Sequence, residues 1–109
     1  MKILIVDDER AIRNSLSEIL TDEGYAVDVA EDGAAALVKV EKEKFDLIFC
    51  DIKMPNMDGI EFLGKLVDMG VDTAVVMISG HGDIETAVEC IKKGAFDFVR
   101  SLSISTEYS

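Results

Sequence analysis

The sequence predicts an α/β protein built on a doubly wound sheet of five parallel strands, with helices on both faces. Two observations predict this fold class. Short apolar runs alternate along the chain with stretches whose apolar residues recur at helical spacing, and Asp or Gly stands at most of the changeovers. Because parallel neighbours must be joined by a crossover, usually a helix, this alternation is typical of a parallel sheet covered on both sides.

Three strand patterns and two helix patterns fill the first half of the chain. The strands are expected at 2–6, 25–30 and 45–50, where β-branched and aromatic residues cluster. Apolar residues at helical spacing indicate the helices, and they are Ile12, Leu16, Ile19 and Leu20 in the first and Ala36, Leu37 and Val40 in the second. We expect Gly24 to cap the first helix and Asp32-Gly33 to form a turn before the second.

The second half continues the alternation to residue 99 and then departs from it. A loop at 52–58 holds Pro55, the only proline of the sequence, and precedes a helix marked by Ile60, Leu63, Leu66 and Val67, which ends near Gly70. A strand at 73–78, a loop at 79–82, a helix between Asp83 and Gly94 and a strand at 96–99 follow. The last nine residues are Ser-rich, so the final helix of the scheme is missing or altered. We therefore expect one domain at 1–100 and an atypical tail at 101–109.

Length and charge exclude several classes of protein. The chain has 109 residues, enough for one domain, and a formal net charge of −11. Nucleic-acid phosphates and anionic lipids are both bound through Lys and Arg, so direct binding to nucleic acid or to a membrane is not expected. The chain shows no signal-peptide pattern and no apolar run of about 18 residues, and its two cysteines, Cys50 and Cys90, make no disulfide framework. These features predict a cytoplasmic protein.

Acidic and hydroxyl residues follow the expected strands. Asp7 and Asp8 come after the first, Asp51 after the third and Ser79 after the fourth. Ligands of open α/β sheets bind at the carboxyl ends of the strands, so these side chains converge if the first and third strands are neighbours. Close carboxylates stay ionised together only with a cation, and an oxygen-only site suits Mg²⁺. A carboxylate beside Mg²⁺ can also act as a nucleophile toward phosphorus. The alternative interpretation is that each Asp is only a helix N-cap or a turn residue.

Four motifs together resemble the receiver domain of two-component response regulators. They are ILIVDDE at 3–9, DIKMPNMDG at 51–59, SGHG at 79–82 and GAFDF at 94–98. The resemblance covers about residues 2–100, and the stretch 79–98 is most similar to receivers of NtrC-type regulators. It implies a sheet in the order 2-1-3-4-5 and, in a full-length regulator, an ATPase and a DNA-binding output domain after the receiver.

The resemblance also implies a role for each motif residue. Asp51 would be the phosphoacceptor, Asp8 a direct Mg²⁺ ligand, Asp7 a ligand through water, and Lys53 a ligand through its backbone carbonyl. Ser79 would contact the phosphoryl group and Phe98 would be the aromatic residue that switches with it. Met54 and Pro55 would shape the loop behind Asp51, and Gly59 would supply the backbone freedom that this loop needs.

One departure from the family pattern concerns the end of the chain. The family has a lysine followed by proline three residues past the switch aromatic, where this sequence has Ser101 and Leu102. Arg100 is one position away and points to the opposite face of a strand, so it is not assumed to replace the lysine. Without the final helix, apolar surface beside Ile12, Leu16 and Ile19 would be exposed, and a homodimer could cover it.

The sequence therefore favours a Mg²⁺-dependent switch, not an enzyme, phosphorylated on Asp51 by a sensor histidine kinase. The alternative is a pseudo-receiver, an interaction module that keeps the fold without phosphorylation, and the missing lysine favours it. A small acid phosphatase is disfavoured because no general acid stands near the nucleophile in the sequence. His81 is interpreted as a loop residue near the site, and both cysteines as core or half-buried thiols.

Overall fold

The computed structural model describes residues 1–52, 54–78 and 97–99, and within them five strands form one parallel sheet in the order β2-β1-β3-β4-β5. The strands are β1 (Lys2–Val6), β2 (Ala26–Ala30), β3 (Leu47–Asp51), β4 (Ala74–Ile78) and β5 (Asp97–Val99). Strand β1 lies between β2 and β3, with Val6 paired to Ala30 on one side and to Cys50 on the other. The predicted fold class and strand order are confirmed.

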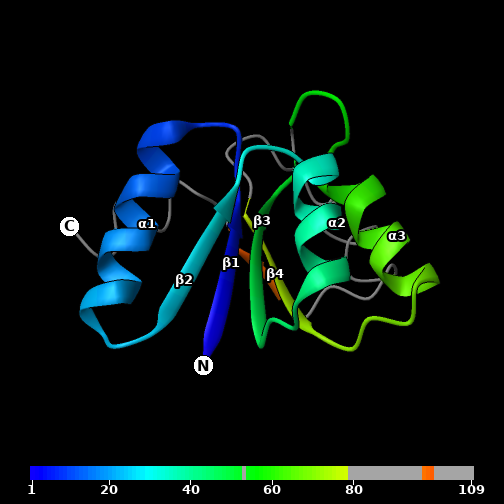
Figure 1. Cartoon of the computed structure of the whole chain (residues 1–109). Helices are drawn as coiled ribbons and strands as arrows, with labels where there is room; N and C mark the ends of the chain where they lie inside the picture. The colour runs from blue at the N-terminus through cyan, green and yellow to red at the C-terminus, as the bar shows by residue number, and fades with distance from the viewer. Residues whose placement is uncertain (53, 79–96, 100–109) are drawn as a thin grey trace.

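Helices cover both faces of the sheet. Helix α1 (Arg10–Asp22) packs on one face, and α2 (Gly33–Lys42) and α3 (Gly59–Asp68) pack on the other (Figure 1). None of the helices in the described part of the chain is both long and apolar enough to cross a membrane. The expected helix between Asp83 and Gly94, the tail at 101–109 and the altered final helix lie outside the described residues.

The core has two halves, one on each face of the sheet, and β1 contributes to both. Alternate residues of a strand point to opposite faces, so Ile3 and Ile5 pack with Leu16 of α1, while Leu4 and Val6 join the cluster under α2 and α3. These four residues of β1 are all buried, and only Lys2 at its start is not. This explains why β1 is a continuous apolar run and not an alternating one.

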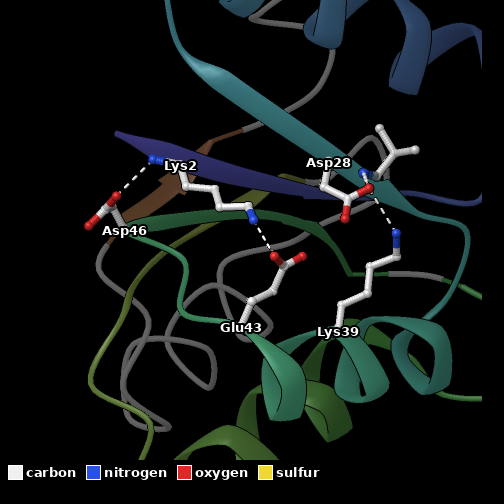
Figure 2. Close-up of polar contacts among 6 residues, drawn as sticks. Lys2, Asp28, Lys39, Glu43 and Asp46 are labelled. Carbon is white, nitrogen blue, oxygen red and sulfur yellow. Dashed lines mark hydrogen bonds and ion pairs between the residues drawn. The ribbon is translucent and has the colours of Figure 1, made fainter.

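Two ion pairs connect α2 and its C-cap residue to strands β2 and β1 (Figure 2). The Lys39 ammonium lies 2.8 Å from the Asp28 carboxylate on β2, and the Lys2 ammonium pairs with Glu43. The backbone N–H of Lys2 donates to Asp46 at 2.7 Å. These contacts fix the carboxyl-terminal end of α2 against β1 and β2.

The structure corrects some element boundaries. Asp32 is the N-cap of α2 and accepts a hydrogen bond from the Ala35 N–H, and Gly33 is already helical, so the predicted turn belongs to the helix start. Gly24 follows the C-cap of α1 with φ +94°, as predicted. Strand β3 begins at Leu47, two residues later than expected.

The apolar face of α1 is only partly as expected. Ile19 is exposed and Ile12 is half-buried, but Leu16 is buried against the sheet. Ile3 and Ile5 of the central strand cover Leu16, so among these three α1 residues only Ile19 is exposed. The altered final helix, on which the expected exposure of this surface depends, lies outside the described residues.

Candidate metal and phosphoacceptor site

Three carboxylates converge at the carboxyl ends of β1 and β3. Asp51 is the last residue of β3 and Asp7 directly follows β1, and the pairing of Val6 with Cys50 places the two side by side. Carboxylate oxygens of Asp7, Asp8 and Asp51 all lie within 4.8 Å of one another. Asp7 is buried, Asp51 is half-buried and Asp8 is exposed, so the cluster opens from the core toward solvent.

The environment of Asp7 makes its charge costly without a cation. The pKa of Asp7 is raised to about 6, chiefly by burial and to a lesser degree by the neighbouring charges of Asp8 and Glu9. The Glu9 N–H, which donates to Asp7 Oδ1 at 2.8 Å, and the Arg13 charge act in the opposite direction. Arg13 itself donates to the Asp7 backbone carbonyl at 2.8 Å. A cation beside this carboxylate would remove the cost of its ionisation.

The donor set fits Mg²⁺. All three side chains offer carboxylate oxygens, which hard divalent cations prefer. The exposed Asp8 side of the cluster leaves room for the water molecules that Mg²⁺ retains and for a phosphoryl oxygen. Within the described residues, these observations define a carboxylate cluster that can bind a metal ion.

The loop after Asp51 approaches the backbone of Asp51 and Ile52 closely at Gly59. A Cβ atom at this position would lie 2.9 Å from the Cα of Ile52, 3.0 Å from the carbonyl carbon of Asp51, and closer still to the carbonyl oxygen of Asp51. The Gly59 N–H donates to the Ile52 carbonyl at 2.6 Å. Gly59 does not have a positive φ. The expectation that it supplies backbone freedom is therefore wrong: glycine is needed because there is no space for a side chain.

The positive φ of this loop belongs to Asn56, at 69°. Asn56 also donates through Nδ2 to the Asp32 carboxylate at 3.0 Å. Neither residue was predicted from the sequence as part of the site. The one signal for Asn56 is that asparagine tolerates the left-handed region better than most residues do.

The remaining predicted site residues are only partly placed. Phe98 lies in β5, paired with Met77 of β4, and this describes its backbone alone. Lys53, Ser79, His81, Cys90, Arg100 and Ser101 lie outside the described residues. Cys50 is buried in the core as expected, and its Sγ lies 3.3 Å from the Asp51 carbonyl oxygen.

Comparison with known proteins gives consistent matches across the chain. The family described as "Response regulator receiver domain" matches residues 3–100. The nitrogen assimilation regulatory protein NtrX of Azorhizobium caulinodans is 46% identical over 99 residues, which are 89% of this chain and 22% of that protein. The transcriptional regulatory protein FixJ of Rhizobium meliloti is 39% identical over 87% of this chain and 47% of its own length. The chain thus spans less than half of each of these two relatives.

Solved structures match the fold equally well. The receiver domain of NtrX from Brucella abortus superposes with a TM-score of 0.84 at 38% identity, covering 97% of this chain and 95% of that one. The chemotaxis protein CheY4 of Vibrio cholerae gives a TM-score of 0.87 at 35% identity, covering 92% and 85%.

Proposed function

Because this chain belongs to the response regulator receiver domain family, we propose that it is a switch phosphorylated on Asp51 by a sensor histidine kinase. The match to NtrX confirms the predicted likeness to receivers of NtrC-type regulators. The observation that carries the proposal is the cluster of Asp7, Asp8 and Asp51, whose oxygens lie within 4.8 Å of one another. An acidic group of this kind at the strand ends suits metal-assisted phosphoryl transfer better than a purely structural role.

The residues of the cluster take different parts in the proposed reaction. Asp8 and Asp51 would ligate Mg²⁺ directly, Asp7 would do so through water, and Lys53 would contribute its backbone carbonyl. When bound, Mg²⁺ neutralises the charge that develops on the transferring phosphoryl oxygens. The half-buried Asp51 would attack the phosphorus with a carboxylate oxygen. The buried Asp7 forms the innermost part of the carboxylate cluster.

Residues of the two neighbouring strands and the loop between them would then respond to the phosphoryl group. A phosphoryl group carries a charge of about −1.5 to −2 and three strong acceptor oxygens. We propose that Ser79 donates its hydroxyl to one of them and that Phe98 changes position with Ser79. Slow hydrolysis of the acyl phosphate releases phosphate and regenerates the Asp51 carboxylate. The chain therefore acts as a switch and not as a turnover enzyme.

The wider setting is proposed from the relatives. NtrX and FixJ are named as regulatory proteins and are longer than this chain, so we propose that residues 1–100 control a transcriptional output through an ATPase and a DNA-binding domain. The tail at 101–109 lies outside this receiver unit. Because the whole chain has a net charge of −11, we propose that it does not itself bind nucleic acid or anionic membranes and that it acts in the cytoplasm.

A test with purified protein, Mg²⁺ and acetyl phosphate decides the proposal. We expect a mass gain of about 80 daltons, one phosphoryl group, that disappears in Asp51→Asn and when EDTA removes the metal. No gain at saturating donor would favour the second candidate, a pseudo-receiver. The specific observation in favour of that candidate is Ser101, which stands where the family has its lysine.

A further inference from the structure

Two loops meet at the carboxyl end of the sheet, beside the carboxylate cluster. One joins β2 to α2 and contains Asp32, and the other joins β3 to α3 and contains Asn56 (Figure 1). The two oxygens of Asp32 have separate partners. Oδ1 accepts the Ala35 N–H at 2.8 Å and caps α2, while Oδ2 accepts Nδ2 of Asn56 at 3.0 Å. A single carboxylate therefore joins the start of α2 to the loop that follows Asp51.

A second contact brings the same two loops together. A Cβ atom at Gly33 would lie 2.9 Å from Cγ of Met57 and 3.0 Å from the Met57 carbonyl oxygen. Residue 57 therefore packs directly on the backbone of the first helical residue of α2. The neighbours of Asp32 and Asn56, Gly33 and Met57, thus touch as well, so the hydrogen bond is not an isolated surface contact.

The loop is held at its base as well as at its tip. At its base, Gly59 donates to the Ile52 carbonyl at 2.6 Å, and at its tip Met57 donates to the Pro55 carbonyl at 2.7 Å. Asn56 lies at this tip with φ 69° and reaches Asp32 from there. The described part of the loop that follows Asp51, residues 54–58, is thereby held between the sheet and α2.

We propose that Asp32 is a positioning residue for the metal site, acting through Asn56 to fix the loop that directly follows Asp51, whose residue 53 would, under the proposed function, ligate Mg²⁺ through its backbone carbonyl. This inference rests on the proposed function, which assigns that carbonyl to the metal. The hydrogen bonds from the Ala35 N–H and from Asn56 hold the pKa of Asp32 below its usual range. Asp32 is therefore ionised at neutral pH, with both oxygens available as acceptors.

The test measures Mg²⁺ affinity of the unphosphorylated protein by calorimetry. Asp32→Ser keeps an N-cap oxygen for α2 but cannot reach Asn56. Asn56→Gly accommodates the positive φ, leaves the net charge unchanged and removes the donor. We expect each variant to bind Mg²⁺ about 3- to 10-fold more weakly, the value of one lost hydrogen bond. The double variant should bind no more weakly than either single variant, since all three lose the same interaction.

Controls separate positioning from charge and from stability. Asp72→Ser removes one carboxylate from an exposed position ahead of β4, away from the cluster, and should leave the affinity unchanged. Melting temperatures of all variants are recorded, because a purely structural role would lower them without changing the Mg²⁺ affinity.

The outcomes are distinct. Wild-type affinity in both single variants, or losses that multiply in the double variant, would overturn the positioning role and leave the proposed function intact. If the wild-type protein itself binds no Mg²⁺, the proposed function fails and the positioning role fails with it.

Discussion

Gly59→Ala tests the close approach between the first residue of α3 and the backbone of Asp51 and Ile52. The added Cβ would lie 2.9 Å from the Cα of Ile52, whereas carbon atoms in good contact are about 3.5–4.0 Å apart. The first turn of α3 must then move away from β3 by several tenths of an ångström or more. Overpacking of this kind costs about 1–3 kcal/mol. Weakening the bond from the Gly59 N–H to Ile52 adds about 1 kcal/mol.

We therefore expect Gly59→Ala to lower the free energy of unfolding by about 2–4 kcal/mol. Urea unfolding followed by circular dichroism measures it. Gly70→Ala, just past the other end of α3, is the matched control. Gly70 has φ +71°, and a Cβ atom added there would have nothing within 4 Å, so alanine costs only the left-handed conformation, about 1–2 kcal/mol.

The two variants should also differ at the metal site. Gly59→Ala displaces the backbone next to Asp51 and should weaken Mg²⁺ binding, whereas Gly70→Ala should not. If Gly59→Ala lowers the free energy of unfolding by less than about 2 kcal/mol, the reasoning from steric contact is refuted.

Other contacts of the described residues lead to three further predictions. Because the pKa of Asp7 rises from 3.8 to about 6 on folding, the native state binds more protons between these values, and metal-free protein should lose stability as pH rises through them. Asp7→Asn should recover up to about 3 kcal/mol at neutral pH, measured by urea unfolding in EDTA at about pH 5 and about pH 7.5; an unchanged pH dependence would contradict the assignment. The partly exposed Lys39–Asp28 pair should contribute about 0.2–1 kcal/mol in a double-mutant cycle. Bonds from Lys39 and from a backbone N–H outweigh burial and lower the pKa of Asp28, so this contribution should disappear as pH falls below about 4. Finally, if apolar surface around the exposed Ile19 drives dimerisation, light scattering should show a dimer that Ile19→Lys weakens, and a wild-type monomer at high micromolar concentration would exclude it.

The sheet and the carboxylate cluster could be predicted because both depend on short-range sequence patterns. A run such as Lys2–Val6 has few alternatives to a buried strand, and parallel pairing brings every strand end to the same edge. Asp7 and Asp51 therefore meet although 44 residues separate them.

The supporting contacts of the site could not be predicted in this way. The hydrogen bond from Asn56 to Asp32 joins residues 24 positions apart in two different loops. It depends on how far these side chains extend in the folded structure, and hydrophobic periodicity in the sequence carries no information about that. The reason for glycine at position 59 was missed for a related cause. A sequence shows that a glycine is present, but only the packed structure shows that a carbonyl group of β3 fills the space.

The first two residues form hydrogen bonds at the start of β1, a central strand of the sheet, and this affects how the protein can be labelled. The Met1 carbonyl accepts the Ala26 N–H, and Lys2 is held by Asp46 and Glu43. The Met1 side chain is nonetheless exposed. The chain begins at the end of the sheet opposite the carboxyl ends of β1 and β3 (Figure 1). A fluorophore or affinity tag joined ahead of Met1 can therefore leave the molecule without approaching Asp51. Trimming the chain past Lys2 would instead remove the contacts that hold β1 to the start of β3 and the end of α2.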